Sequence, residues 1–229
     1  MGFLKFDRGS ILEPAQPLTV FPMLTVLGKP SSINVRKVLW TCAEIGLAYE
    51  LQPWGEADLP TASPEFLRHN PRGLVPVLLH DGETLWESNT MCRYLAAQHG
   101  RHDLLPAQPL ARAHVEKWMD WQATELNNAW RYAFMALVRN SPAHTDAQAI
   151  AASVAGWNGM MAILEQRLRE TGAYAAGADF TLADVVLGLS VHRWAAAPLA
   201  HADLPAVRAY YERLSQRPGF LAHGRNQYP

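Results

Sequence analysis

The positions of apolar residues divide the chain into a first part with short strands and a second part that is helical. Between residues 24 and 100, short apolar runs typical of strands alternate with segments whose apolar residues recur at helical spacing. The order is strand, helix, strand, helix, strand, strand, helix, with the strands at 24–28, 47–52, 75–80 and 84–87. We therefore predict a parallel strand–helix–strand unit and an antiparallel hairpin in one mixed sheet, covered by helices.

Local signals support these elements, with one exception. Asp81-Gly82 separates the last two strands, and this dipeptide favours a two-residue hairpin. Ser63 followed by Pro64 predicts the start of a short helix. Pro76 is unusual, because it lies near the start of an apolar strand and removes a main-chain hydrogen-bond donor.

The second part carries apolar stripes at helical spacing, within 115–137, 150–168, 182–194 and 204–216. These stripes predict an all-helical bundle. Thr181 and Asp184 form a capping-box pattern at the start of the third stripe. The predicted fold class is thus an α+β domain followed by an all-α domain. We expect an N-terminal extension at 1–22, the sheet domain at 23–100, a linker at 101–110 and the helical domain at 111–229.

Composition narrows the classes of function. Hydrophobic residues make up 49% of the 229 residues and the net charge is −1, so we expect a sizeable core and no nucleic-acid partner. Cys42 and Cys92 are too few for a disulfide framework and favour a reducing cytoplasm. No apolar run reaches the ~18 residues that span a membrane, and the N terminus is interrupted by Lys5, Asp7 and Arg8. We therefore expect neither a membrane segment nor a signal peptide.

Charged and metal-ligating side chains form no other clear constellation. His99 and His102 flank Gly100 and share no helix face, and no carboxylate pair completes a metal site. No metal is expected. Arg36 and Lys37 follow each other in the first predicted helix, and we expect them on a solvated face.

Four segments, taken together, resemble the glutathione transferase superfamily in their order and spacing. They are PSSINVRKV (30–38), NPRGLVPVL (70–78), ESNTMCRYL (87–95) and FTLADV (180–185). The resemblance extends over roughly residues 23–222 and is greatest to bacterial, serine-type, theta/beta-like cytosolic members. It implies a thioredoxin-like βαβαββα domain that binds glutathione, an all-helical bundle domain, a homodimer and a cytoplasmic location.

The resemblance also explains the proline in the strand. Pro76 corresponds to the family's cis-proline, which turns the main chain of Val75, next to Leu74, toward the cysteinyl part of glutathione. Glu87 would receive the γ-glutamyl ammonium. Ser88 and the free amides of its helix N-terminus would receive the γ-glutamyl carboxylate, although Ser88 can equally serve as a plain helix cap.

The glutathione thiol needs a hydrogen-bond donor, because a free thiol of pKa ~8.5 is only a few per cent ionised at neutral pH. By position, Ser32 corresponds to the catalytic serine of serine-type members. Asn34 corresponds to an asparagine that contacts the sulfur in some bacterial members, and Ser31 takes the role if the register shifts by one residue. All three stay open. The segment holds no tyrosine or cysteine, which disfavours the tyrosine- and cysteine-type classes.

The glycyl end of glutathione lacks its expected partner. Many serine-type relatives carry a His or Lys before the cis-proline, where this chain has Thr61, Ala62 and Gly73. We considered three side chains as replacements: His69, Arg72 and Lys37.

The pocket for the second substrate is expected between the domains, on the first long helix of the helical part. Its candidate residues are Asn127, Trp130, Arg131 and Phe134. Arg131 can orient an anionic electrophile, but a solvated or salt-bridged arginine is the simpler interpretation.

The implied function is conjugation of the glutathione thiolate to small hydrophobic electrophiles, with glutathione as co-substrate. One alternative is a zeta-like maleylacetoacetate isomerase, although Asn34 and Val35 replace that class's second serine and tryptophan. A peroxidase and a non-catalytic protein-binding module of the same fold are further alternatives.

Overall fold

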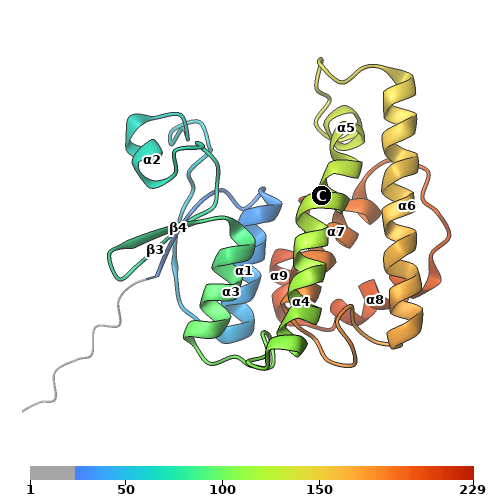
Figure 1. Ribbon diagram of the computed structural model, residues 1–229. Coiled ribbons are helices and arrows are strands. Elements are labelled where there is room, and N and C mark those ends of the chain that lie inside the picture. The colour runs from blue at the N-terminus through green and yellow to red at the C-terminus, as the bar shows by residue number, and fades with distance from the viewer. Residues whose placement is uncertain (1–23) are drawn as a thin grey trace, which may run out of the picture.

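The computed structural model describes residues 24–229, which form a sheet domain and a helical domain side by side (Figure 1). The predicted extension at 1–22 lies outside the described residues. The sheet domain contains four strands: β1 (Thr25–Leu27), β2 (Glu50–Gln52), β3 (Val77–His80) and β4 (Glu83–Trp86). Their order is β2-β1-β3-β4, with β1 parallel to β2 and antiparallel to β3, and β4 antiparallel to β3. The predicted mixed sheet is confirmed.

Helices cover both faces of this sheet: α1 (Ile33–Ile45) and α3 (Ser88–Gln98) on one, α2 (Pro64–His69) on the other. Alternate residues of a strand point to opposite faces. Accordingly, Val26 and Leu78 belong to the large core beneath α1 and α3. Leu27 and Val77 instead pack in a small cluster with Phe66 of α2.

The β3–β4 connection is the tight hairpin that the sequence predicts. Asp81 and Gly82 have φ angles of 53° and 79°. Positive φ at both central residues defines the turn that matches the twist of two antiparallel strands. Glycine adopts such angles without steric cost, and aspartate is one of the few other residues that tolerate them.

The second domain is helical throughout, as predicted. Its elements are α4 (Pro109–Trp121), the π-helical turn η1 (Gln122–Leu126), α5 (Asn127–Leu137), α6 (Ala147–Thr171), α7 (Leu182–Ala196), α8 (Pro205–Leu214) and α9 (Pro218–His223). Helix α7 is buried along nearly its whole length and contacts α1, α4 and α8. A Cβ atom at Gly188 would lie 2.6 Å from Leu214 and 3.0 Å from Trp40. Only glycine therefore permits this close approach around α7.

Helix α6 corrects the expectation that no segment is long and apolar enough to span a membrane. Its 25 residues meet that criterion by length and composition. In the structure α6 packs against α5 and α8, and its buried face includes Trp157, Met161 and Leu164. We therefore assign α6 to the helical domain.

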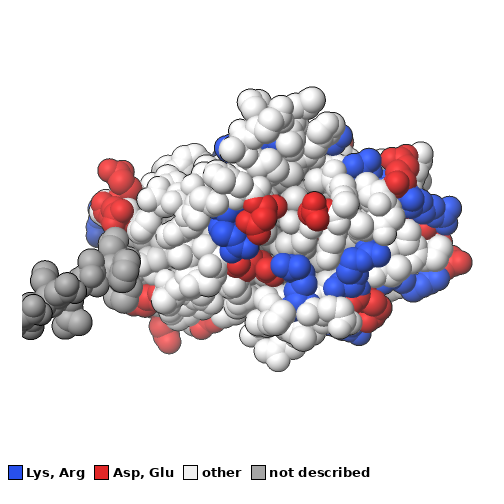
Figure 2. Space-filling model, turned by 90° about the horizontal axis from the view of Figure 1, so that it is seen from below, with Lys and Arg blue, Asp and Glu red and all other residues white. Residues whose placement is uncertain are grey.

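The segment that follows α9 folds back against α1 and α7. Arg36 of α1 is 1% exposed, and its guanidinium donates to the carbonyl oxygen of Tyr228 (2.7 Å) and to an oxygen of Pro229 (3.1 Å). The imidazole of His192 on α7 lies 3.1 Å from the same Tyr228 oxygen. The expectation that Arg36 is solvated was wrong, because the folded-back segment covers it. On the face seen in Figure 2, other charged groups of both signs lie interspersed among uncharged surface.

The predicted capping box at the start of α7 is confirmed, and its acid holds together three segments. Asp184 is fully buried. Its carboxylate accepts hydrogen bonds from the amide of Thr181 (2.9 Å), the amide of Ala175 (2.9 Å) and the hydroxyl of Tyr210 (2.9 Å). Burial raises the pKa of Asp184 to about 6.

We expect Asp184→Ala to lower the free energy of unfolding by roughly 3 kcal/mol or more, because several buried donors lose their acceptor at once. The matched control is Asp179→Ala, at an exposed position just before the capping box, which should change stability by about 0.5 kcal/mol or less. Denaturant unfolding of both variants checks this. Equal small effects would show that the buried carboxylate does not stabilise the fold.

Candidate functional site

A cavity of about 610 Å³ lies between the two domains. The sheet domain contributes the loops around β1, α2 and β3, and the helical domain contributes α5, the loop after it and α7. Residues that line the sheet-domain wall include Lys29, Ser32, Asn34, Gly55, Thr61, Gly73, Leu74 and Val75. Residues that line the helical-domain wall include Trp130, Arg131, Phe134, Arg139, His144 and Arg193.

The junction of β1 and α1 presents two of the three predicted sulfur donors to this cavity. Ser32 is the N-cap residue of α1, with extended φ and ψ of −82° and 123°, but its side chain makes no capping hydrogen bond. Its hydroxyl is thus available within the described part of the chain. Asn34 lines the same cavity and also two smaller ones. Ser31 lines none of these three cavities.

The loop before β3 has the predicted cis peptide bond, between Val75 and Pro76. Val75 lines the large cavity, and its main-chain N–H and C=O have no hydrogen-bond partner among residues 24–229. The buried side chain of Asn70 fixes the loop by donating to the Leu74 carbonyl (2.7 Å) and accepting from the Arg72 amide (3.0 Å). Main-chain groups without partners are therefore held at the cavity wall by the Asn70 side chain.

A smaller cavity of about 130 Å³ adjoins the first one, with which it shares Asn34, Leu74 and Val75. It is also lined by Glu87 and Ser88. Glu87 is the N-cap residue of α3, and no side chain caps the first turn. Ser88 is therefore the first residue of α3 and not its cap. Free amides at a helix N-terminus, beside a hydroxyl, form a site for an anion.

The backbone of Glu87 is strained. Its φ and ψ are 75° and 104°, a region that residues with a Cβ atom avoid. Such conformations cost about 1–3 kcal/mol and are concentrated at functional sites. The strain places the exposed Glu87 carboxyl group at the rim of the smaller cavity.

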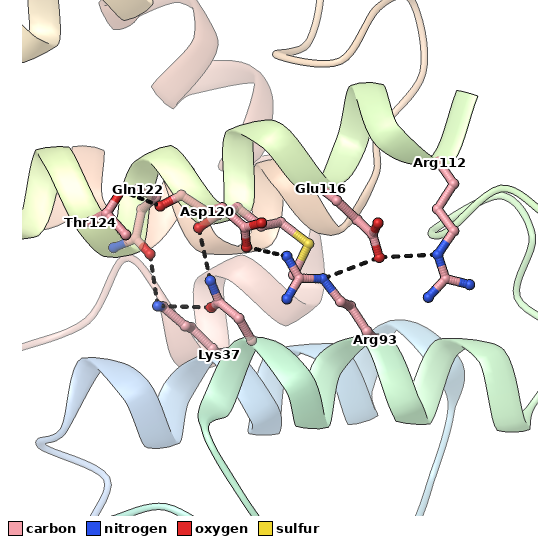
Figure 3. A network of polar contacts seen from close by, with 9 residues as sticks. Lys37, Arg93, Arg112, Glu116, Asp120, Gln122 and Thr124 are labelled. Carbon is pink, nitrogen blue, oxygen red and sulfur yellow. Dashed lines mark hydrogen bonds and ion pairs between the residues drawn. The ribbon is translucent and has the colours of Figure 1, made fainter. Parts of the chain in front are cut away.

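A buried polar network joins the two domains next to these cavities (Figure 3). The Lys37 ammonium donates to the side-chain oxygens of Asn89 (3.0 Å) and Gln122 (2.8 Å). Gln122 in turn donates to Ser190 (3.0 Å) and Asn127 (3.0 Å). Burial lowers the pKa of Lys37 to about 8. The expectation that Lys37 is solvated was therefore wrong. Its ammonium is also not free to bind the glycyl carboxylate of glutathione.

Ion pairs continue this contact between the domains toward the surface (Figure 3). Arg93 of α3 pairs with Asp120 and, at 3.3 Å, with Glu116, both on α4. Arg112 donates to the same Glu116 carboxylate at 3.0 Å.

Three of the four residues predicted for the electrophile pocket line the large cavity: Trp130, Arg131 and Phe134. Asn127 does not. Its side-chain oxygen accepts from Gln122 (3.0 Å) and from the indole of Trp130 (3.1 Å). Asn127 therefore supports Trp130, which itself lines the cavity.

Sequence reasoning missed three cationic residues of the large cavity. Lys29 follows β1, and its ammonium donates to the Gly55 carbonyl (2.8 Å); its place directly before the PSSIN segment was an available signal. Arg139 lies just after α5. Arg193 lies on α7, where the apolar sequence around it indicates only a core helix.

Comparison with known families decides the identity of the fold. The family described as glutathione S-transferase, N-terminal domain, matches residues 31–98, and that described as glutathione S-transferase, C-terminal domain, matches residues 147–213. The chain belongs to the glutathione S-transferase family. The predicted family and its two-domain fold, a thioredoxin-like domain followed by a helical one, are thus confirmed.

Individual members of the family resemble the chain over most of its length. Glutathione S-transferase GstB of Escherichia coli K12 is 38% identical over 199 residues, which cover 86% of this chain and 95% of that protein. Glutathione S-transferase 3 of Zea mays is 33% identical, covering 86% and 91%. The theta class glutathione S-transferase of Xanthomonas axonopodis pv. citri, solved with glutathione bound, superposes with a TM-score of 0.85 at 33% identity, covering 91% of this chain and all of that one.

Metal ligands do not gather in the described structure. Within residues 24–229, no group of three or more His, Cys, Asp or Glu side chains is placed to hold a metal ion. The expectation that this glutathione S-transferase uses no metal stays a prediction.

The backbone strain at Glu87 can be tested by comparing the stability of its glycine and alanine variants, because strain should reverse the usual order of the two. We expect Glu87→Gly to be more stable than Glu87→Ala by about 1 kcal/mol, because only alanine keeps a Cβ atom at this φ. Denaturant unfolding of the unliganded variants measures the difference. The control pair is at Glu83 in β4, outside the positive-φ region, where glycine should be the less stable by about 0.5–1 kcal/mol. If alanine is more stable than glycine at both positions, the backbone of Glu87 is not strained.

Proposed function

We propose that this protein is a glutathione transferase that joins the glutathione thiolate to small electrophiles. The observation that carries the proposal is one continuous surface of matching groups. The Ser32 hydroxyl, the unpaired main chain of Val75, and the Glu87–Ser88 corner at the start of α3 line two adjoining cavities. Membership of the family supports the same function, and so does the similarity to the Xanthomonas relative that was solved with glutathione bound.

The tripeptide fits this surface from end to end. Its cysteinyl main chain pairs with the N–H and C=O of Val75, as an added strand would. The γ-glutamyl carboxylate lies at the N-terminus of α3 beside Ser88, and its ammonium faces Glu87. We assign the glycyl carboxylate at the opposite end to Lys29, which lines the large cavity together with Thr61.

Lys29 replaces the His or Lys that many relatives carry before the cis-proline. The other candidates considered from the sequence are less suitable. Lys37 is buried in the network between the domains. Arg72 lines the smaller cavity, at the γ-glutamyl end, and His69 lines neither cavity.

Activation of the thiol needs no separate base. Lowering a thiol pKa by two units requires ~2.7 kcal/mol. A hydrogen bond to a charged group contributes about 1.5–3 kcal/mol, and a helix N-terminus adds about 0.3–2 kcal/mol. The Ser32 hydroxyl and the N-terminus of α1 together reach the required amount. Asn34 is the alternative donor on the same wall, whereas Ser31 is disfavoured because it lines neither cavity.

The thiolate sulfur then attacks the electrophilic carbon and a carbon–sulfur bond forms. In a substitution, the leaving group departs with its electron pair. In an addition, the other carbon of the double bond takes up a proton. Trp130 and Phe134 give this part of the cavity an aromatic floor for the second substrate. A role in detoxification, a cytoplasmic location and a homodimer belong to the same proposal. No feature of the site specifically favours the isomerase, peroxidase or non-catalytic alternatives.

We expect Ser32→Ala to raise the pKa of enzyme-bound glutathione by about 1–2 units, which is the loss of one hydrogen bond to a charged acceptor. The ultraviolet absorbance of the thiolate, titrated against pH, measures this, and the pH profile of kcat/KM should shift to higher pH by the same amount. Ser31→Ala is the matched control and should leave both unchanged. A shift in Asn34→Ala instead would assign the donor role to Asn34. No glutathione binding by the native protein at millimolar concentration would refute the proposed function.

Lys29→Gln should raise the Kd for glutathione about tenfold, because a charge-assisted contact worth ~1.4 kcal/mol or more is lost. Calorimetric titration of glutathione, and of glutathione esterified at its glycyl carboxylate, separates this contact from all others. The ester should bind the native protein and the variant equally. Lys117→Gln, at an exposed position on α4, controls for loss of charge. If the variant weakens both ligands alike, Lys29 acts on the fold of the loop and not on the carboxylate.

A further inference from the structure

The wall that faces the glutathione surface carries an unusual concentration of positive charge. Arg131 on α5, Arg139 just after it and Arg193 on α7 all line the large cavity. No aspartate or glutamate lines this cavity in the described part of the chain. A pocket for purely apolar electrophiles does not need three guanidinium groups, whose desolvation is costly.

These charges are not balanced by acidic side chains. Within residues 24–229, none of the three arginines forms an ion pair with an aspartate or glutamate side chain. Arg131 and Arg139 are exposed to the cavity and to solvent. Arg193 is 3% exposed; it donates to an oxygen of Pro229 at 3.3 Å, while its buried Nε has no hydrogen-bond partner in the described structure.

Aromatic rings hold two of the three arginines, Arg139 and Arg193, in place. The Arg193 guanidinium carbon lies 4.6 Å from the ring centroid of Trp130 and 4.1 Å from that of Phe134. The Arg139 guanidinium carbon lies 5.4 Å from the Phe134 centroid. Stacking of this kind orients a guanidinium group and leaves its edge free for a ligand.

The positive charges are close enough to affect one another. Burial, followed by repulsion from Arg36 and Arg139, lowers the pKa of Arg193 to about 9. Arg36 does not line the cavity, and its guanidinium donates to oxygens of Tyr228 and Pro229. A negative charge entering the cavity would relieve this repulsion.

Glutathione itself does not account for the cluster. In the proposed binding mode its peptide lies on the sheet-domain wall, and its glycyl carboxylate faces Lys29 on that wall. The arginines come from the opposite wall, together with Trp130 and Phe134, where the second substrate must lie to meet the sulfur.

We propose that the second substrate is an electrophile that carries a carboxylate on a small apolar body, and that Arg131, Arg139 and Arg193 bind this carboxylate. The proposal rests on the proposed transferase function and names its substrate class. A planar guanidinium offers two parallel donors that match a carboxylate. The aromatic floor packs against the apolar body and brings the electrophilic carbon toward the sulfur.

The test compares 4-chloro-3-nitrobenzoate with its methyl ester, which differ by the negative charge. In both, the thiolate forms a bond to the ring carbon, the carbon–chlorine bond breaks, and chloride leaves with the electron pair. Each rate is divided by the uncatalysed rate with free glutathione, because the two rings differ in reactivity. We expect the normalised kcat/KM of the native protein to be at least about tenfold higher for the acid, which corresponds to ~1.4 kcal/mol.

The variants Arg131→Gln and Arg139→Gln test whether these arginines cause the preference for the acid over the ester. Both positions are exposed, so the fold should be kept. Each should lower kcat/KM for the acid about tenfold, mainly through its KM, and change the ester less than twofold. The KM for glutathione should stay within twofold. Arg208→Gln, an exposed arginine on α8 that does not line the cavity, is the matched control and should change neither substrate.

Binding measured without turnover makes the test independent of the leaving group. Quenching of tryptophan fluorescence by benzoate and by benzamide, with S-methylglutathione present, should show at least about tenfold tighter binding of benzoate. This preference should be lost when Arg131→Gln and Arg139→Gln are combined in one protein.

Equal binding of benzoate and benzamide, or an ester converted as well as the acid, would overturn this inference and leave the transferase function standing. A rise in the KM for glutathione in the arginine variants would also overturn it, because the cluster would then bind the glycyl carboxylate. Failure of the proposed function is recognised separately, by the absence of glutathione binding.

Discussion

The arrangement of the two domains depends on one buried ammonium group. Lys37 projects from α1 and is met by side-chain oxygens of Asn89 on α3 and Gln122 in η1, and within residues 24–229 it forms no direct ion pair with a carboxylate. A buried charge without a counter-ion is costly unless its donors are satisfied. The network therefore stabilises one relative position of the domains, because moving either of them would leave the ammonium or its acceptors unpaired in the interior.

The π-helical turn makes this geometry possible. Gln122 is its first residue and Asn127 follows its last. One extra residue in a helical turn rotates the side chains that follow relative to those before, which is why such turns occur at functional sites. Here Gln122 is directed into the contact between the domains, where it reaches Lys37 and also Ser190 on α7. Residues of α5 after the turn, beginning with Trp130, are directed at the cavity. The polar contact between the domains and the cavity wall are thus formed by the consecutive helical elements η1 and α5.

How much of this could be predicted from the sequence follows from the range of the interactions. The hairpin at Asp81-Gly82 and the capping box at Asp184 depend on neighbours within a few residues, and the local sequence predicts both. The cis bond before Pro76 is expected only from the resemblance to the family. Lys37 is different: its partners lie 52 and 85 positions away, so its sequence suggested a solvated cation. Arg193 escaped notice for the same reason, because only the tertiary fold brings the middle of α7 to the cavity. Lys29 differs, because it stands directly before the PSSIN segment and could have been recognised from the sequence.

The two walls of the cavity differ in the kind of group that they offer, and in the proposed function each wall binds one of the two substrates. The sheet-domain wall uses main-chain groups of Val75 and the helix ends at Ser32 and Ser88, which are fixed by backbone conformation. The opposite wall uses long side chains of α5 and α7. Their charge can be changed without altering any backbone position, except that Arg193 is also packed against Trp130 and Phe134. In this proposal, binding of the peptide is a property of the fold, whereas the choice of electrophile depends on a few guanidinium groups. Of these groups, only the exposed ones can be exchanged without disturbing the core.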